Sequence, residues 1–359
     1  MGLKYEALSA EDVKRAVEGR GAVRPPAHMH IWPGEGLREY HGEEAVSEVF
    51  APYPDDVVNG GIVQPGGWEA PEGFSGDYRW AWHDQSEAPQ QAGGRDSGGG
   101  ILYDWDHFDE FMDSFPQADD PRIFDGVRNA VENADGRYVL ALAWNNFYER
   151  LWGLRGMQNL LMDFHLQKEN MRTLCRALKD LVLKFVEGAA ECGADGFFTS
   201  NDLGHQTGLM MSPDTFREFL KPLHAEVAAA CHERGMHYWM HSCGNLTDIL
   251  EDMIEVGLDC LHPLQYGAMD WEKSARIIDG RMTAWAGVDV QHILQEATPE
   301  GVREHVRFLI DTFDRPGEGR CVVAAGNGIT GSTPLENIDA FLDETFRYGL
   351  GEARMRNEE

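Results

Sequence analysis

The sequence predicts an α/β fold, a single (β/α)8 TIM barrel spanning residues 1–359, and three observations point to it. After about residue 135, short apolar runs alternate with long amphipathic stretches, which is the pattern of strand–helix units in a parallel sheet. Glycines at positions 193, 235, 257 and 280 follow the amphipathic stretches, as expected at helix ends. Finally, one such barrel occupies about 200 to over 400 residues, so this chain fits a single domain.

Eight short apolar runs are the candidate strands. Six of them follow residue 135, and two earlier ones complete the number that a closed barrel requires. In chain order the predicted strands are 27–31, 57–63, 138–144, 195–200, 237–241, 258–262, 282–287 and 321–325.

Amphipathic stretches fill the intervals between the later strands and are the predicted helices. Ser212 followed by Pro213 suits the N-cap and first turn of one of them. The predicted helices are 169–192, 212–234, 245–256, 270–279, 299–313 and 333–348.

Residues 64–100 form a long N-terminal insertion with little periodicity. This stretch is rich in Gly, Pro, Trp and Gln and ends in Asp96-Ser-Gly-Gly-Gly100. Long loops of this kind often act as lids or binding loops, although a plain flexible excursion is equally compatible with the composition. We expect the insertion to lie over a site or an edge of the sheet.

The charge balance disfavours several classes of partner. The chain has 61 acidic against 31 basic residues, a formal charge of −30, which repels nucleic acid, anionic membranes and polyanionic substrates. There is no apolar stretch of about 18 residues, and Met1-Gly-Leu-Lys-Tyr-Glu6 does not resemble a leader, so we expect a cytoplasmic protein. Six cysteines scattered through a chain of this size do not indicate a disulfide scaffold. A small-molecule substrate remains compatible with all of these features.

His241 and Cys243 stand at the end of the predicted strand 237–241. Residues i and i+2 of an extended chain lie on the same face. The imidazole of His241 and the thiol of Cys243 can therefore bind one tetrahedral zinc ion if other strand ends add ligands. A single His-x-Cys is a weak pattern, and a buried cysteine beside a hydrogen-bonded histidine is the alternative.

Other polar side chains follow the remaining predicted strands, at the end where barrels carry their chemistry. Asp202 and His205 are candidate metal ligands, whereas Asp202 can also simply turn the chain and Asp289 can cap the next helix. The candidate substrate-binding residues are His30, Trp144, Asn145, His205, Gln265, Asp289 and Asn327.

Several motifs, in the right order over roughly residues 120–350, resemble the uroporphyrinogen decarboxylase (URO-D) superfamily. The resemblance implies a (β/α)8 barrel and one of two activities: cofactor-free porphyrinogen decarboxylation, or zinc-dependent methyl transfer with methylcorrinoid proteins. The motifs are Gly193-Ala-Asp-Gly196, Asp202-Leu-Gly-His205, Ser212-Pro-Asp-Thr-Phe-Arg-Glu-Phe-Leu-Lys-Pro222, His241-Ser-Cys-Gly-Asn245, Gly287-Val-Asp289 and Thr333-Pro-Leu-Glu-Asn337.

The decarboxylase branch of the superfamily uses N-terminal arginines to hold the many carboxylates of its substrate. In this chain the matching segment runs from Met29 to Tyr40, with His30 at the first arginine position and Glu35 or Gly36 at the second. A chain of strong negative charge without those arginines is poorly equipped for such a substrate.

The methyltransferase branch carries His-x-Cys and a distant second cysteine, and Cys321 follows Cys243 at a suitable separation. However, Cys321 begins a predicted strand, so at about 3.3 Å per residue it lies roughly 20 Å from the rim at Asn327. Asp202 or His205 is then the replacement ligand.

We therefore expect a zinc-dependent methyltransferase that works with a corrinoid carried by a partner protein, with His241, Cys243 and Asp202 as its catalytic residues. Trp80 and Trp82 of the insertion are candidate contacts to that partner. The alternatives are a metal-free decarboxylase of the uroporphyrinogen type that uses a rim aspartate such as Asp202, and a non-catalytic barrel that binds a corrinoid, a tetrapyrrole or a protein.

Overall fold

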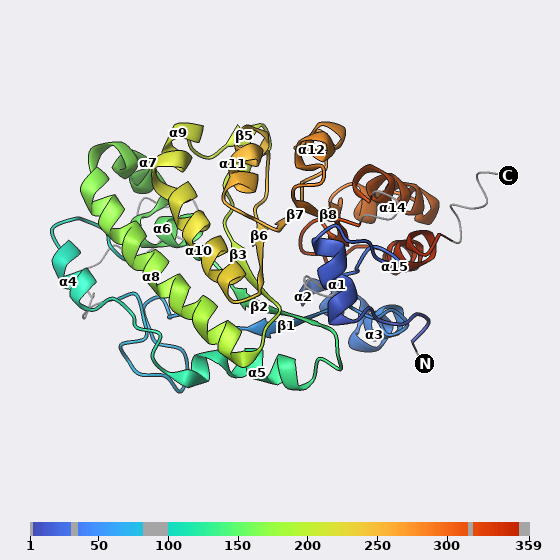
Figure 1. Cartoon of the computed structure of the whole chain (residues 1–359), viewed down its shortest axis with the longest axis horizontal. Coiled ribbons are helices and arrows are strands. Elements are labelled where there is room, and N and C mark those ends of the chain that lie inside the picture. Colours follow the sequence, from blue (N-terminus) through green and yellow to red (C-terminus); the bar gives the residue numbers. More distant parts are fainter. Residues whose placement is uncertain (1–2, 30–34, 82–99, 315–318, 352–359) are drawn as a thin grey trace.

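A computed structural model describes residues 3–29, 35–81, 100–314 and 319–351. Within these ranges seven parallel strands form one curled sheet in the order β1-β2-β3-β6-β7-β8-β9, with helices packed around its outside (Figure 1). A two-stranded hairpin, β4 and β5, stands apart from the sheet. The strands are β1 (Val57–Gly61), β2 (Tyr138–Ala143), β3 (Gly196–Ser200), β4 (Gly204–His205), β5 (Gly208–Leu209), β6 (His237–His241), β7 (Cys260–His262), β8 (Thr283–Val288) and β9 (Cys321–Ala325). The predicted α/β class with a parallel sheet is confirmed.

The first predicted strand, 27–31, is reduced to a single bridge over the residues that the structure describes. Ala27 makes a single parallel bridge to Val323 of β9, and its carbonyl oxygen accepts a hydrogen bond from Asp56, just before β1. Pro25 and Pro26 precede it and have no N–H groups with which to extend a ladder. Residues 30 and 31 lie outside the described ranges. A short segment, rather than a strand, therefore connects the two edges of the curled sheet.

Helices in the second half of the chain agree closely with the sequence prediction. α14 has the predicted bounds, whereas the predicted helix 212–234 is divided into α9, the π-turn η2 and α10, with Pro222 in the first turn of α10. Proline removes a backbone donor, which explains the break. These helices are α8 (Lys168–Cys192), α9 (Pro213–Thr215), η2 (Phe216–Leu220), α10 (Lys221–Glu233), η3 (Thr247–Ile249), α11 (Leu250–Glu255), α12 (Trp271–Ile278), α13 (Ile293–Glu296), α14 (Pro299–Phe313) and α15 (Leu335–Gly349).

The first half of the chain contains several short helices that periodicity did not predict. They are α1 (Ala10–Val17), α2 (Glu35–His41), α3 (Glu43–Phe50), α4 (Phe108–Asp113), η1 (Pro121–Phe124), α5 (Asp125–Glu132), α6 (Tyr148–Arg155) and α7 (Met157–Leu166). α1 begins with a capping box between Ser9 and Asp12 and places Val13 and Val17 in the core inside the sheet. It therefore closes the amino-terminal end of the strands.

The core inside the curled sheet is built from alternate residues of each strand. Trp239 of β6 and Trp285 of β8 meet edge to face, with ring centroids 5.0 Å apart, and Phe198 of β3 packs against Trp285 at 5.8 Å. The residues between them, such as Tyr238 and Ala286, belong to the larger core under the helices. Because side chains alternate along a strand, this pattern fixes which residues point inward at the far strand ends.

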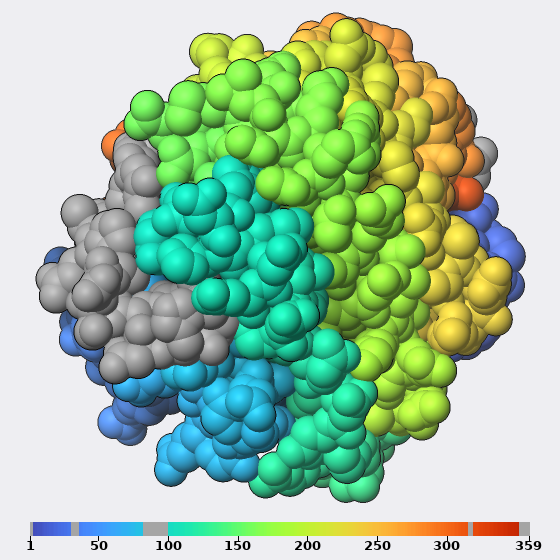
Figure 2. Space-filling view, turned by 90° about the vertical axis from the view of Figure 1, so that its left-hand side faces the viewer, coloured from blue at the N-terminus to red at the C-terminus, as the bar shows by residue number. Residues whose placement is uncertain are grey.

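The described part of the predicted insertion is irregular, with one bridge between Gly66 and Arg79. Trp80 is 2% exposed and packs against Phe115, so its predicted role as a partner contact is wrong. Trp82 lies outside the described residues. Figure 2 shows the face next to this region, where the teal segment that includes α4 and α5 lies against the green helix α8.

No helix within the described ranges combines the length and the apolar character needed to span a bilayer.

Candidate metal centre

The candidate site lies at the carboxyl-terminal ends of β3 and β6, on the inner side of the sheet. Trp239 points into the inner core, so His241, two residues later on β6, points the same way at the end of the strand. Asp202 follows β3 by two residues, and β3 and β6 are adjacent, with Ser200 opposite His241. Strand pairing thus brings Asp202, His241 and Cys243 together.

Three potential ligand atoms, one from each of these residues, all lie within 4.8 Å of one another. His241 Nε2 is 3.3 Å from Asp202 Oδ1 and 3.3 Å from Cys243 Sγ. The backbone N–H of Cys243 also donates to Asp202 Oδ1 at 3.0 Å. His241 and Asp202 are buried, whereas Cys243 is half-buried. Solvent therefore reaches the cluster on the side of the Cys243 sulfur.

Two glycines allow the loops that carry these ligands to pack closely. A Cβ on Gly204 would lie 2.8 Å from the carbonyl oxygen of Cys243, and a Cβ on Gly244 would overlap Gly204 itself. Gly244 also has a φ of +87°, which L-residues rarely adopt. A hydrogen bond from Asn245 N to His205 O, 2.8 Å long, joins the loops.

The His241 ring is held from behind by a second buried histidine. His262 Nδ1 lies 2.7 Å from His241 Nδ1, and His262 Nε2 lies 2.9 Å from the carbonyl oxygen of Ala325. A carbonyl oxygen only accepts, so His262 Nε2 carries its proton and donates. Burial, together with the His241 and His28 rings, holds the pKa of His262 well below its usual value, so its Nδ1 is an acceptor. His241 must therefore donate through Nδ1.

His241 is electrostatically coupled to the other two members of the cluster. Burial lowers the pKa of its ring, but the hydrogen bonds with Asp202 and Cys243 outweigh this effect and raise that pKa to about 10. Without a metal ion, both ring nitrogens of His241 therefore carry a proton at neutral pH. A divalent cation among the same acceptors would replace the proton on Nε2.

Asn327, which follows β9, contacts the cluster without offering it an oxygen. Its Nδ2 donates to Cys243 Sγ at 3.2 Å, and its Oδ1 accepts from Gly328 N at 2.7 Å. The second bond fixes the orientation of the amide. Asn327 therefore acts on the cysteine sulfur as a hydrogen-bond donor.

The donor set fits zinc. At ordinary zinc–ligand distances, a tetrahedral ion keeps neighbouring nitrogen, sulfur and oxygen ligands about 3.4–3.6 Å apart. The two separations of 3.3 Å at His241 Nε2 are close to these values. One nitrogen, one sulfur and one carboxylate oxygen leave the fourth position open, as catalytic zinc sites do.

The structure places other predicted residues around the cluster. Gln265 accepts a hydrogen bond from Gly244 N through Oε1 at 2.7 Å, so it supports the Cys243 loop. Trp144 is half-buried and meets the inner-core residue Phe198 edge on, at 4.9 Å. Both follow strands of the sheet at the same end as the cluster.

Three predicted residues that the structure describes are not brought into the cluster. The exposed ring of His205 contacts Thr207 at 3.4 Å within the β4–β5 hairpin. Asn145 is exposed, with a φ of 54°. Asp289 accepts from the N–H groups of Gln291 and His292 in the turn before α13, whose N-cap is His292, so it orders that turn and does not cap the helix as the sequence suggested. The remaining predicted residue, His30, lies outside the described residues.

Sequence reasoning missed the contact between His262 and His241. The strand alternation contained the necessary information, because His262 is two residues beyond the inner-core residue Cys260 and is paired in register with His241. Cys321, in contrast, begins β9 and belongs to the core under the helices. It is therefore not part of the cluster.

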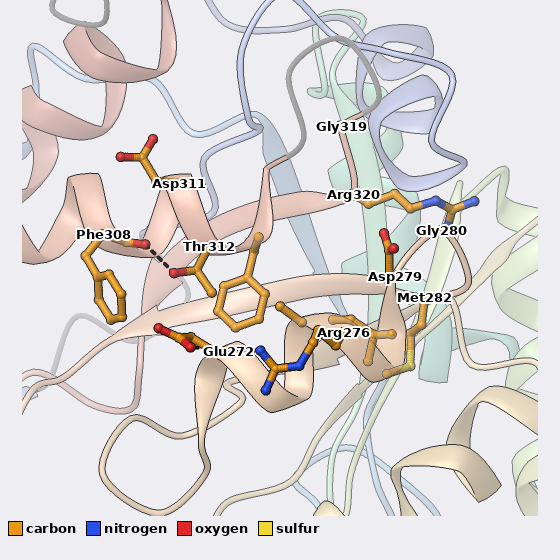
Figure 3. A pocket seen from close by; sticks show the side chains of 13 residues that line it. Glu272, Arg276, Asp279, Gly280, Met282, Phe308, Asp311, Thr312, Gly319 and Arg320 are labelled. Carbon is orange, nitrogen blue, oxygen red and sulfur yellow. Dashed lines mark hydrogen bonds and ion pairs between the residues drawn. The ribbon is translucent and has the colours of Figure 1, made fainter. Parts of the chain in front are cut away.

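A pocket of about 450 Å³ lies at the other end of the strands (Figure 3). α12 and α14 line it, together with Met282 before β8 and Arg320 before β9. Since Asp202 and His241 stand at the carboxyl-terminal ends, this pocket is separate from the candidate metal centre.

Comparisons with known proteins identify the family of the chain. A family model described as uroporphyrinogen decarboxylase (URO-D) matches residues 151–348. A methylated-thiol–coenzyme M methyltransferase of Methanosarcina mazei is 24% identical over 189 residues, 53% of this chain and 48% of the relative. A methylcobamide:CoM methyltransferase, MtaA, of Methanosarcina barkeri is 24% identical over 169 residues, 47% of this chain and 46% of the relative. The chain thus spans about half the length of the curated relatives it matches.

Among solved structures, a methyltransferase from Methanosarcina mazei superposes with a TM-score of 0.67. The alignment covers 96% of this chain and 99% of that one, at 16% sequence identity. At this identity the likeness concerns the fold, which the two proteins share over nearly their whole lengths.

Proposed function

The chain belongs to the uroporphyrinogen decarboxylase (URO-D) family, and on that premise we propose that it is a zinc-dependent methyltransferase. The methyl group would pass from a methylcorrinoid protein to a small-molecule thiol or a similar acceptor, in the cytoplasm. Relatives named as coenzyme M methyltransferases support the reaction class.

One observation carries the proposal. Asp202, His241 and Cys243 present three different metal-ligating atoms within 4.8 Å at the carboxyl-terminal ends of parallel strands. That is the end where barrels of this type hold their catalytic groups. Three protein ligands are the number found in catalytic zinc sites, because the open position receives water or substrate.

In this proposal His241 Nε2, Cys243 Sγ and an Asp202 carboxylate oxygen hold zinc. When bound, zinc would lower the pKa of an acceptor thiol so that a thiolate exists at neutral pH. The acceptor sulfur would form a bond to the methyl carbon as the cobalt–carbon bond breaks, and the electron pair of that bond would stay on the corrinoid of the partner. Asn327 donates to Cys243 Sγ, while Trp144 stands at the same end of the sheet.

The test combines metal analysis with an activity assay. Purified protein reconstituted with zinc and desalted should contain about one zinc per chain. It should also transfer methyl groups from methylcobalamin to coenzyme M, followed as the loss of methylcobalamin absorbance. His241→Ala and Cys243→Ala should lose both properties, whereas His224→Phe, a buried histidine on α10, should keep both.

Methyl transfer at an undiminished rate by zinc-free protein or by His241→Ala would refute the zinc role. If zinc-free protein instead releases CO2 from a porphyrinogen, the metal-free decarboxylase is the correct assignment. Saturable corrinoid binding without turnover by zinc-loaded protein would identify a non-catalytic barrel.

A further inference from the structure

His262 lies behind the candidate ligands on β7 and makes no contact with an open surface. Its side chain is fully buried, and its ring lies 4.7 Å from Trp285, measured between centroids. The ring of His241 lies on its other side, 5.0 Å away and tilted by 32°. A histidine in this position is either a packing residue or a residue that orients its neighbour.

The hydrogen-bond partners distinguish these two roles. His262 is tied through Nε2 to the backbone oxygen of Ala325 at the end of β9, at 2.9 Å, and through Nδ1 to His241 Nδ1, at 2.7 Å. The carbonyl oxygen requires a proton on His262 Nε2, which leaves the lone pair of Nδ1 to accept from His241. His241, His262 and Ala325 all lie on strands of the sheet, so the geometry of these two hydrogen bonds is rigid.

We infer that His262 is the positioning residue of the metal centre. Anchored on Ala325, it keeps a proton on His241 Nδ1 and so directs Nε2 of the same ring toward Asp202 and Cys243. Outer hydrogen bonds of this kind fix the tautomer and orientation of a ligating histidine. The part that concerns zinc depends on the proposed function, whereas the histidine pair itself does not.

The first experiment needs no metal. In protein labelled with ¹⁵N-histidine, His262 should show a protonated Nε2 and an unprotonated Nδ1. A scalar coupling across the hydrogen bond should connect the Nδ1 atoms of His241 and His262. A proton on His262 Nδ1, or no coupling between the two rings, would overturn the inference.

The second experiment measures zinc affinity by competition with a chelator. His262→Phe keeps a ring against Trp285 but removes the acceptor, and we expect zinc to bind about 10- to 100-fold more weakly. His262→Gln, whose amide oxygen can accept from His241 Nδ1, should recover most of the affinity. The control His224→Phe removes a buried histidine that bonds to Tyr238 OH at 2.8 Å, away from the centre, and should bind zinc as wild type does.

Equal zinc affinity in wild type and His262→Phe would contradict the inference, as would a loss in His224→Phe as large as that in His262→Phe. If His262→Phe does not fold, the comparison of wild type with His262→Gln and the NMR measurement decide. If wild-type protein binds no zinc, the proposed function fails while the NMR result still decides whether His262 orients His241.

Discussion

At the scale of single residues, the nitrogen that we propose as a zinc ligand also binds a proton. His241 Nε2 faces Asp202 and Cys243, and its pKa of about 10 means that a proton occupies it at neutral pH when no metal is bound. Metal binding must displace that proton. The cost of displacement falls as pH rises, because fewer molecules still carry the proton.

We therefore expect zinc affinity to increase between pH 6 and pH 9, and zinc binding at pH 7 to release the His241 proton. The measurement is calorimetric titration in buffers of different ionisation enthalpy, and the control His224→Phe should release protons as wild type does. The stability of the metal-free protein should change in the opposite direction. The folded-state pKa is raised from 6.5, so this stabilisation is complete below pH 6.5 and disappears as pH rises toward 10. Zinc affinity that is constant over this pH range would contradict the assignment.

The sequence identified the cluster residues better than it identified their contacts. His241 and Cys243 follow from the alternation of an extended chain, and Asp202 follows from its position after a strand. The role of Asn327 did not follow, because it depends on an amide orientation fixed by the backbone of Gly328. Hydrogen-bond direction is a property of the folded loop and leaves no periodic pattern in the sequence.

At the scale of structural elements, two loops rather than two strands determine the spacing of the ligands. The loop after β3 carries Asp202 and the loop after β6 carries Cys243, and they touch through Gly204 and Gly244. Any side chain at this contact must push the loops apart. A shift of about 1 Å is enough to disrupt a site that depends on position.

Gly204→Ala should therefore weaken zinc binding by about tenfold or more, because its Cβ would lie 2.8 Å from the oxygen of Cys243 and 2.9 Å from Asn245 N. Gly208→Ala is the matched control in the same hairpin, since its Cβ would meet only His205 Nε2, at 3.9 Å. Competition with a chelator gives both affinities. Equal affinities for the two variants would show that the loop contact does not set the ligand spacing.

Helices and strands were predicted correctly where the apolar periodicity is strong. They were missed where contacts between distant parts of the chain, rather than periodicity, determine the local structure. α8 and α14 are long amphipathic helices whose bounds were predicted to within one residue. The β4–β5 hairpin, two residues on each side, is too short to show alternation. The break at η2 depends on Pro222, which sequence reasoning treated as part of one continuous helix.

At the scale of the whole molecule, a buried ion pair joins the two edges of the sheet. Asp56, just before β1, is fully buried and accepts from both terminal nitrogens of Arg24, at 2.6 and 2.9 Å. It also accepts from the backbone N–H groups of Leu8 and Ala27, at 2.7 and 2.6 Å. Ala27 bridges to Val323 of β9, so one carboxylate organises the segment that replaces an eighth strand. Sequence reasoning missed this network because isolated charged residues are usually exposed.

Asp56→Ala should accordingly destabilise the protein by about 3–5 kcal/mol, because it leaves the Arg24 guanidinium buried without its counter-charge and two backbone donors without acceptors. Urea unfolding of the metal-free protein gives this difference, since bound zinc would add its own stabilisation. The control Glu272→Ala removes an exposed ion pair with Arg276, 3.9 Å apart, and should change stability by less than about 1 kcal/mol. A similar loss in both variants would mean that the carboxylate of Asp56 does not hold the sheet edges together, and that packing around Ala27 does so instead.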